Sequence, residues 1–582
     1  MKNILLSTAL FFTASVVAQT DAPLKSFASS PAFKNHIESV MKKAMDTTYK
    51  YVAIPTIAEK TMATGQHLPY PVLFIHGLNS SSDAWLTFYT DAMAKGWSYG
   101  GTLPYCLNTD GNLYYSNMTD ITDFSGVLQP SDFYLLNFNV DANGTAYGSN
   151  YNTSTQSNMA AAVKQGFIMK SAINHILQAT GRDKVVLVCH SMGGLASREY
   201  IQNTSNWQTD NQHHIAKLVM SGTPNGGSDA TGTWVTSAFT PDESSDAVRD
   251  LRTDYFYSGD PGVYLYGGLE DNTVMDDQLF SNFYNVDVNC NGVGGDMIVG
   301  LNQKTLSQNL DFSSIIGNWW ADPTGVGDGV VDVSEAQIKN FYTVVSETYT
   351  VNANHLDLTR QIKETYLGLD EPDYSQLAYT VQTNTNYIGY ITQQATDAQF
   401  TTIDYDYFTF SLPQAGSISV FADNIVTPSL GIKIIDATNT QMFNQTYSSY
   451  PVQSSPITLN AGQYTLEFSG NPTDSSWKYA YNFIINYTPA MTTLINNYTD
   501  GNTFKVWPNP SANEMQVALS VSNVASSEIK IYNINGELIE TRLVNNTCIN
   551  QRFDVSKWQP GYYTVSVKNE TNTTYKKFCK IN

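Results

Sequence analysis

One stretch decides the fold of the central part of this chain. It runs Lys184-Val185-Val186-Leu187-Val188-Cys189, then His190-Ser191-Met192-Gly193-Gly194, then Leu195-Ala196-Ser197-Arg198-Glu199-Tyr200. The first run is apolar and rich in valine, which predicts a buried strand, and the last run predicts a helix. A turn this tight between strand and helix needs small flanking residues, and it presents the Ser191 hydroxyl at its tip. Cys189 stands where glycine is usual, and we interpret it as a variant because cysteine is small and tolerates burial.

Apolar runs on both sides extend this pattern. Tyr70–Ile75, Asp132–Asn139 and Ile215–Met220 predict further short buried strands, and Asn158–Ala179 predicts a helix. Short buried strands separated by helices are typical of an α/β unit with a mainly parallel sheet. The sequence therefore predicts such a unit around Ser191.

A base for Ser191 can be found by elimination. A serine hydroxyl is a weak nucleophile unless a base accepts its proton and an anion orients that base. Where such a turn carries the nucleophile, the chain order is Ser, acid, His, and five of the eight histidines precede Ser191. His213 and His214 come just before the strand Ile215–Met220, whereas catalytic groups gather beyond the carboxyl ends of strands. His355 is therefore the predicted base.

The acid should lie between Ser191 and His355, beyond a strand. Asp328 lies in the glycine-rich turn Gly327-Asp328-Gly329-Val330-Val331, 27 residues before His355, and it is our prediction. Four other aspartates remain rivals, of which Asp332 is the nearest: Asp296, Asp311, Asp322 and Asp332.

The stretch Pro71-Val72-Leu73-Phe74-Ile75-His76-Gly77-Leu78 resembles the strand and His-Gly loop that precede the oxyanion hole of α/β-hydrolases. The resemblance implies that the backbone N–H groups of Leu78 and Met192 hold the developing oxyanion. His76 and His190 flank the site in sequence, and we expect structural roles for both.

The Asp-Gly-Val-Val loop resembles the acid loop of secreted bacterial lipases. Together with Ser221–Ser228, the motifs described so far resemble this lipase family, in the same order along the chain, over roughly residues 70–365. The resemblance implies an α/β-hydrolase catalytic domain that cleaves carboxylic esters with Ser191, His355 and Asp328, and no cofactor for the chemistry.

His355-Leu356-Asp357, followed by Gln361, also resembles the calcium-binding loop of one lipase group. This implies Asp357 and Gln361 as ligands of a structural Ca²⁺, with Asp296 or Asp311 as candidates for the missing aspartate. The alternative is that Asp357 is a solvated residue at the start of a helix.

A long insertion separates Ser228 from Asn289. It contains Tyr255-Phe256-Tyr257 and Tyr264-Leu265-Tyr266, with Trp319-Trp320 further on. An aromatic insertion of this kind forms either a lid or acyl-chain wall, or an ordinary core, and the sequence leaves both open.

The chain beyond the hydrolase-like part consists of strands alone. Residues 373–490 resemble the bacterial pre-peptidase C-terminal type of β-sandwich. Two motifs carry this resemblance: Asp406-Tyr407-Phe408-Thr409-Phe410 and Leu459-Asn460-Ala461-Gly462-Gln463-Tyr464. Residues 491–502 form a polar linker. Residues 503–582 predict a second small sandwich, because apolar and polar positions alternate between turns such as Asn535-Gly536.

Three motifs of that last unit resemble the C-terminal sorting domain of the type IX secretion system: Val506-Trp507-Pro508-Asn509-Pro510, Ile531-Tyr532-Asn533 and Pro560-Gly561-Tyr562-Tyr563. The resemblance implies passage across the outer membrane and the type IX secretion machinery as a partner. Residues 1–18 have one lysine and then an uncharged apolar run that ends at Ala18, which predicts a cleavable signal peptide. No run is apolar for long enough to predict a transmembrane segment.

The net charge of −21 is unevenly distributed. Residues 503–582 hold nine basic and six acidic side chains and residues 1–18 hold one lysine, which leaves −25 for residues 19–502. Such an acidic body excludes a nucleic-acid binder, which needs basic surface to neutralise phosphates. Of the five cysteines, Cys548 and Cys579 could pair, Cys106 with Cys290 is a weaker pairing, and Cys189 is expected to be free.

The sequence thus predicts a signal peptide (1–18), an α/β-hydrolase domain (19–370) and two all-β sandwich domains (373–490 and 503–582) joined by a linker (491–502). The predicted function is a secreted or surface-attached lipase or carboxylesterase acting on acylglycerols or other lipid esters. Phospholipid, polyester or short-chain ester substrates are alternatives, as is a surface adhesin or glycan-binding protein with an inactive hydrolase block.

Overall fold

The computed structural model describes most of the chain beyond residue 66. The described residues are 67–109, 118–148, 155–228, 245–251, 264–265, 268–269, 287–291, 293, 297–307, 309–322, 325–344, 346–393, 403–490, 503–520, 526–544, 548–568 and 573–581. The predicted signal peptide and linker lie outside them. The chain divides into two compact units, Met1–Ala490 and Met491–Asn582, and each is described by itself.

An eight-stranded sheet organises the first part of the first unit, in the order β12-β9-β6-β5-β1-β4-β2-β3. Its strands are β1 (Val72–Ile75), β2 (Tyr99–Cys106), β3 (Thr122–Asp123), β4 (Phe133–Asn137), β5 (Val185–His190), β6 (Ile215–Ser221), β9 (Asp311–Gly317) and β12 (Ser346–Val351). Every neighbouring pair from β12 to β2 is parallel, and only β3 runs antiparallel to β2. The predicted α/β class with a mainly parallel sheet is confirmed.

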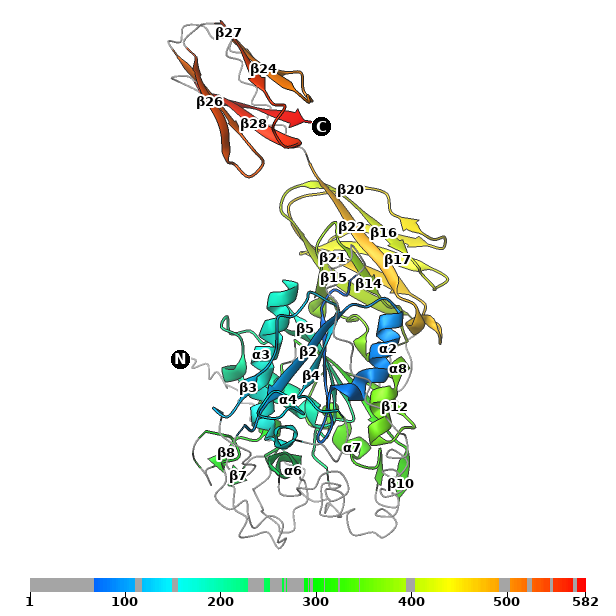
Figure 1. Ribbon diagram of the computed structural model, residues 1–582. Coiled ribbons are helices and arrows are strands. Elements are labelled where there is room, and N and C mark those ends of the chain that lie inside the picture. The colour runs from blue at the N-terminus through cyan, green and yellow to red at the C-terminus, as the bar shows by residue number, and fades with distance from the viewer. Residues whose placement is uncertain are drawn as a thin grey trace, which may run out of the picture. The chain divides into compact units, whose positions relative to one another are not determined.

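The two faces of this sheet bury different residues of the same strand. Along β1, Leu73 and Ile75 join one apolar core, and Val72 and Phe74 join another. This is the alternation that a strand covered on both faces requires. Helices α3 (Ala162–Thr180) and α4 (Met192–Gln202) cover the first face, and α2 (Leu86–Ala94) and α8 (Ile362–Leu369) cover the second (Figure 1).

Shorter elements complete this part. They are η2 (Ser82–Trp85), η4 (Gln156–Met159), η5 (Thr204–Asn206), α6 (Asp246–Leu251), β7 (Gly268–Leu269), β8 (Met297–Ile298), η9 (Leu301–Gln303), β10 (Trp320–Asp322), β11 (Gly325–Gly327), α7 (Val333–Ala336), η10 (Ile338–Asn340) and η11 (His355–Arg360).

A β-sandwich follows within the same unit. Its sheets have the orders β13-β15-β21-β17-β18 and β14-β22-β16-β19, with β20 paired to β16. The bounds, with two 3-10 turns, are η12 (Ser375–Leu377), β13 (Tyr379–Thr380), β14 (Asn386–Gly389), β15 (Asp404–Leu412), β16 (Gly416–Asp423), β17 (Leu430–Asp436), β18 (Gln441–Tyr447), β19 (Val452–Gln453), β20 (Ile457–Leu459), β21 (Gly462–Gly470), η13 (Ser476–Lys478) and β22 (Tyr481–Pro489).

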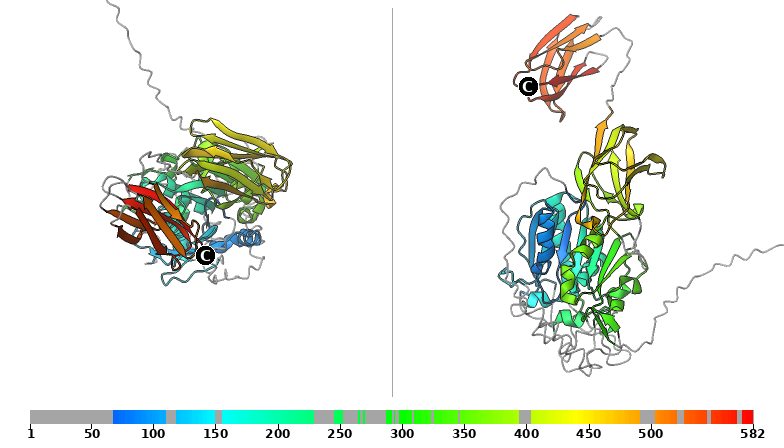
Figure 2. Two further views of the ribbon diagram at one scale, coloured as in Figure 1. Left: turned by 90° about the horizontal axis from the view of Figure 1, so that it is seen from above. Right: turned by 90° about the vertical axis from the view of Figure 1, so that its right-hand side faces the viewer.

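The sandwich packs directly on the α/β part, and we call this contact zone the seam. Trp97 donates its indole N–H to the hydroxyl of Tyr390 at 3.1 Å, and Tyr366 of α8 packs against Trp477 at a ring-centroid distance of 6.0 Å. One apolar cluster contains residues of both parts. Figure 2 shows from two further sides that the sandwich strands adjoin the α/β part.

The described residues of the second unit form an antiparallel sandwich of seven strands with its own apolar core. Its sheets are β23-β24-β27 and β26-β25-β28-β29. The strands are β23 (Thr503–Trp507), β24 (Glu514–Ser520), β25 (Ser527–Tyr532), β26 (Leu538–Val544), β27 (Cys548–Asp554), β28 (Gly561–Lys568) and β29 (Thr573–Lys580).

Two further findings concern cysteines and membranes. Cys106, Cys189, Cys290 and Cys579 are free thiols, so neither suggested disulfide is formed, whereas the expectation for Cys189 is met. Among the described residues, none of the helices combines the length and the apolar character needed to span a bilayer.

Candidate active site

The turn between β5 and α4 holds Ser191 in an unusual conformation. Its φ of 53° and ψ of −129° place a non-glycine residue in a sparsely populated region, which a protein maintains only where the surroundings impose it. The Ser191 N–H donates to the carbonyl of Ser221 at 2.9 Å. A Cβ on Gly193 would lie 2.5 Å from the carbonyl oxygen of His76, so α4 begins in direct contact with the end of β1. The tight turn between strand and helix that the sequence predicted is present.

Ser191, His355 and Asp328 meet beyond the carboxyl edge of the sheet. His355 Nε2 lies 2.9 Å from Ser191 Oγ, and its Nδ1 lies 2.7 Å from Asp328 Oδ2. All three residues are buried, with exposed fractions of 7%, 5% and 1% for Ser191, His355 and Asp328. The three segments come from the ends of β5, β12 and β11. The structure therefore brings together the three residues that the sequence analysis predicted.

Asp328 is held by backbone as well as by His355. Its Oδ1 accepts the N–H groups of Val330 and Val331 at 2.9 and 2.8 Å, because Gly329, at φ 93°, folds the loop back on the carboxylate. Its carbonyl oxygen accepts the His355 N–H at 3.0 Å. With Oδ2 as an acceptor, Nδ1 of His355 carries the proton and Nε2 is left to accept the Ser191 hydroxyl proton.

Two of the four rival acids are placed elsewhere. Asp311 forms an ion pair with Lys217 at 2.9 Å, and Asp332 precedes α7 as its N-cap. Asp296 and the side chain of Asp322 lie outside the described residues.

The loop after β1 lies against Ser191. A Cβ on Gly77 would be 2.7 Å from the Ser191 Cβ. His76 fixes the next peptide: its Nε2 accepts the Phe138 N–H at 2.9 Å, so its Nδ1–H donates to the Gly77 carbonyl, also at 2.9 Å. Burial lowers the pKa of His76 to about 4, which keeps the ring neutral. In a trans peptide the N–H points opposite to the C=O, so the Leu78 N–H is turned away from His76.

Met192 opens α4, whose first N–H groups have no partner within the helix. Such groups attract a developing negative charge. The N–H groups of Leu78 and Met192 thus belong to the two segments that border Ser191.

His190 connects the nucleophile turn to the histidine loop, a contact that its sequence position did not reveal. Its Nε2–H donates to the carbonyl of His355 at 2.8 Å, and the two rings pack with centroids 4.7 Å apart. Burial, together with the charge of His355, lowers the pKa of His190 well below its ordinary value, so the ring is neutral. His190 therefore positions His355 through its backbone.

An apolar cluster surrounds this edge of the site. Met192 and Leu195 pack with Val163, Tyr264 and Leu265, and Leu78 packs against them. Tyr264 is fully buried and donates its hydroxyl to the carboxylate of Glu199. Of the two alternatives for the insertion, a lid or an ordinary core, Tyr264 and Leu265 fit the core. Tyr255–Tyr257 and Tyr266 lie outside the described residues.

In the loop predicted to bind calcium, the proposed ligands are hydrogen-bonded to other groups of the same loop. Both oxygens of Asp357 are hydrogen-bonded, one to Arg360 at 2.7 Å and one to Asn354 at 2.6 Å, and Gln361 donates to the Asp357 carbonyl at 3.0 Å. In the described part of the chain, no group of three or more acidic, histidine or cysteine side chains includes Asp357. This donor set does not fit a calcium ion as it stands, so the calcium site stays a prediction.

Comparisons with known proteins agree with this architecture. A family described as a PGAP1-like alpha/beta domain matches residues 68–240, and one described as a secretion system C-terminal sorting domain matches residues 505–581. No curated protein sequence matches the chain.

Solved structures show more distant likenesses. The product of gene lin2722 from Listeria innocua is 15% identical, covers 53% of this chain and 96% of its own, and has a TM-score of 0.30. The pre-peptidase C-terminal domain of a collagenase from Bacillus anthracis is 12% identical over 20% of this chain and 99% of its own, with a TM-score of 0.15. A β-glucuronidase from Ruminococcus gnavus is 9% identical over 31% and 36%, with a TM-score of 0.11. TM-scores this low carry no functional conclusion.

The two family matches define the class of protein. The chain contains an α/β-hydrolase domain of PGAP1-like type, followed by all-β parts. It ends in a type IX secretion sorting domain, which makes it a protein secreted to the outside or to the cell surface and a client of that machinery.

Proposed function

We propose that this protein is a secreted serine ester hydrolase that cleaves carboxylic esters of apolar acyl groups, with acylglycerols as the first candidate. The observation that carries the proposal is the continuous path Ser191 Oγ–His355 Nε2 (2.9 Å) and His355 Nδ1–Asp328 Oδ2 (2.7 Å). It supports acyl transfer because a positioned base and an orienting anion are what a serine needs to attack an ester.

The reaction proceeds in two balanced halves. Ser191 Oγ attacks the ester carbonyl while its proton passes to His355 Nε2, and the collapsing tetrahedral intermediate expels the alcohol, which takes that proton. Water then attacks the acyl-enzyme, gives its proton to His355, and the free acid leaves as Ser191 recovers its proton. Asp328 does not take a proton but holds the imidazole in the required tautomer.

The oxyanion of both intermediates is stabilised by the N–H groups of Leu78 and Met192 in this proposal. Preorganised N–H donors of this kind are worth about 10²–10³ in rate when one is removed from a serine hydrolase. The fixed Gly77–Leu78 peptide supports this assignment, because a donor whose direction is set in advance needs no reorganisation during the reaction.

The apolar cluster beside Leu78 and Met192 favours an acyl chain over a charged group as the neighbour of the scissile carbonyl. Phospholipid, polyester and short-chain ester substrates use the same chemistry. An adhesin or glycan-binding protein with an inactive hydrolase block is the alternative of another class.

A series of p-nitrophenyl esters of increasing acyl length, cleaved by wild type and by Ser191→Ala, tests the proposal. We expect hydrolysis by the wild type and a loss of about 10⁶-fold in kcat for Ser191→Ala. Wild-type turnover in Ser191→Ala contradicts the mechanism. Failure to cleave any ester favours the binding protein, and a restriction to short soluble esters makes it an esterase.

A further inference from the structure

The loop between β1 and η2 carries Leu78, one of the two proposed oxyanion donors, and its middle has an uncommon conformation. Asn79 has a φ of 52°, in the left-handed region that residues other than glycine rarely adopt. Its side chain is 1% exposed, and within the described residues neither amide atom has a hydrogen-bond partner. The side chain of Asn79 therefore does not hold the loop, and such a conformation persists only where neighbouring groups impose it.

Asn158 supplies a neighbouring group of this kind. It lies on η4 and is fully buried, and its Nδ2 donates to the carbonyl oxygen of Ser80 at 2.6 Å, across 78 residues of sequence. Because a carbonyl oxygen accepts only from the nitrogen of an amide, this contact also determines the orientation of the Asn158 amide. Ser80 follows Asn79, so the hydrogen bond fixes the backbone directly after the left-handed residue.

The position of η4 is itself fixed at the end of β4. The Ser157 hydroxyl donates to the Phe138 carbonyl at 2.7 Å and accepts the Leu107 N–H at 2.8 Å. The N–H of the same Phe138 donates to His76, which in turn donates to the Gly77 carbonyl. The residue after β4 thus anchors the loop on both sides, through the histidine before it and through η4 after it.

The segment from η4 to the start of α3 also reaches the second proposed donor. Gln165, in the first turn of α3, is fully buried, and its Nε2 donates to the Ala160 carbonyl at 2.9 Å and lies 3.6 Å from the Met192 sulfur. This segment therefore contacts both parts of the chain that carry the proposed oxyanion donors. Within it, Asn158 is the residue that binds the backbone of the loop after β1.

We propose that Asn158 is a positioning residue of the ester hydrolysis proposed above, a role that rests on that function. By holding the Ser80 carbonyl, it keeps Asn79 in the left-handed conformation and directs the Leu78 N–H at the oxyanion. An oxyanion donor is effective when it lies about 2.7–3.1 Å from the developing charge and needs no reorientation during the reaction. Without the Asn158 donor, rotation at Asn79 turns the Leu78 peptide away from this direction.

A purely structural role for Asn158 is the competing explanation, and Asn206 provides a matched control. Asn206 is also a buried asparagine and the third residue of a 3-10 helix, η5, which follows α4. In the described part of the chain its Nδ2 has no hydrogen-bond partner. Truncation to alanine removes the same atoms from a buried position in both cases, so both variants lose stability through a cavity. Only Asn158→Ala also releases the loop that carries Leu78.

The test measures kcat, KM and Tm of the full chain on a p-nitrophenyl ester for wild type, Asn158→Ala and Asn206→Ala. Complete loss of one oxyanion donor costs about 10²–10³ in rate and a misdirected donor costs less, so kcat of Asn158→Ala should fall about 10- to 100-fold. Its KM and the pH profile of kcat should stay as in the wild type, because His355 and Asp328 are unchanged. Asn206→Ala should keep wild-type kinetics at a similarly lowered Tm.

Inhibition by a trifluoromethyl ketone separates a defect at the oxyanion from a general loss of packing. Ser191 Oγ adds to the ketone carbon while its proton passes to His355 Nε2, which leaves a hemiketal with its negative oxygen where the oxyanion of the reaction forms. In Asn158→Ala the Ki of the ketone should rise by about the factor by which kcat falls. The Ki of the corresponding trifluoromethyl carbinol, which has no carbonyl group, should stay unchanged.

The inference is overturned if Asn158→Ala keeps the kcat of the wild type, or if its kcat falls while the ketone inhibits it as strongly as the wild type. If Asn158→Ala does not fold, Asn158→Thr takes its place, because threonine has nearly the volume of asparagine and its hydroxyl is too short to reach the Ser80 carbonyl. A wild type that cleaves no ester overturns the proposed function itself, a result distinct from these.

Discussion

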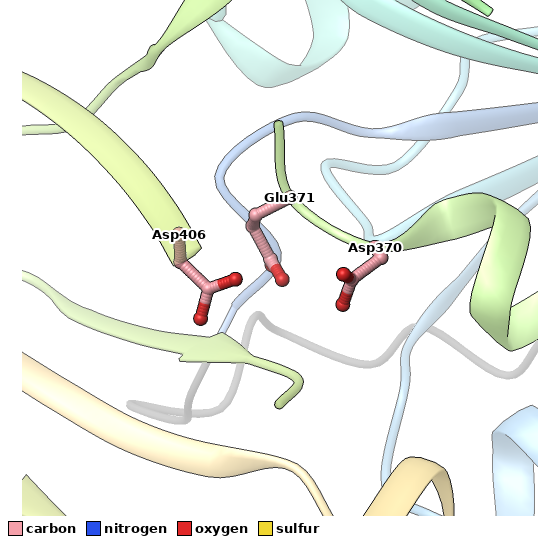
Figure 3. A group of neighbouring side chains, drawn as sticks. All are labelled: Asp370, Glu371 and Asp406. Carbon is pink, nitrogen blue, oxygen red and sulfur yellow. The ribbon is translucent and has the colours of Figure 1, made fainter. Parts of the chain in front are cut away.

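Two buried aspartates of this protein differ in how their charge is compensated. One carboxylate oxygen of Asp328 accepts hydrogen bonds from two backbone N–H groups, and the other accepts one from His355. Asp406 is just as buried but has one hydroxyl donor on one oxygen and no hydrogen-bond partner on the other among the described residues. The chain thus supplies donors to both oxygens of the proposed catalytic acid, whereas burial and the neighbouring carboxylates, among them Glu371 and Asp370 (Figure 3), raise the pKa of Asp406 well above its ordinary value.

The largest expected effect is at Asp328. Asp328→Asn keeps the shape but offers a donor to His355 Nδ1, which favours the wrong tautomer, so kcat should fall by about 10⁴-fold with little change in Tm. Asp332→Asn, in the rival acid, should retain activity. Steady-state kinetics on a p-nitrophenyl ester measures both, and near-normal activity of Asp328→Asn would remove Asp328 from the mechanism.

The next effect is on stability and concerns Lys217. Although burial alone would lower its pKa, Asp311 and Glu347 raise it well above the ordinary value, so the lysine is charged in the folded protein. Lys217→Met leaves these carboxylates buried without their cation, and the free energy of unfolding should fall by about 3–5 kcal/mol. Urea unfolding measures it; an unchanged midpoint would show that the seam does not depend on charge balance.

A smaller effect is expected at His190. His190→Phe keeps a ring against His355 but removes the N–H that its carbonyl accepts. We expect kcat to fall by about tenfold, near 1.4 kcal/mol, with KM unchanged and the pH profile of kcat shifted. His175→Phe is the control, because His175 is paired with Asp123 on the surface of α3. Equal kinetics for the two variants would show that His190 only packs against His355 and does not position it.

The smallest effect is expected at Asp357. Its pair with Arg360 is 41% and 30% exposed, and surface pairs of this kind contribute about 0–1 kcal/mol. Asp357→Asn should therefore have nearly the wild-type Tm in a thermal melt, both with and without added Ca²⁺. If Ca²⁺ raises the Tm of the wild type and this rise is lost in Asp357→Asn, calcium binds at the loop implied by the lipase resemblance.

The sequence predicted which residues meet at the candidate active site better than it predicted the seam. Ser191 and His355 could be predicted because a local motif and a chain-order rule select them. Predicting Asp328 also required its glycine-rich turn and a family resemblance. Strand β9 was not predicted because Ser313 and Ser314 interrupt its apolar run. The seam was not predicted because its residues come from separate segments, and the predicted domain boundary at 370–373 suggested an exposed connection instead of a shared core.

The central claim is tested most directly by a fluorophosphonate, which phosphonylates an activated serine, followed by mass spectrometry of the digested protein. We predict one adduct per chain, on the peptide containing Ser191, with labelling abolished in Ser191→Ala and slowed strongly in His355→Ala. An unlabelled wild type, or a label that remains at full level in Ser191→Ala, would contradict the account.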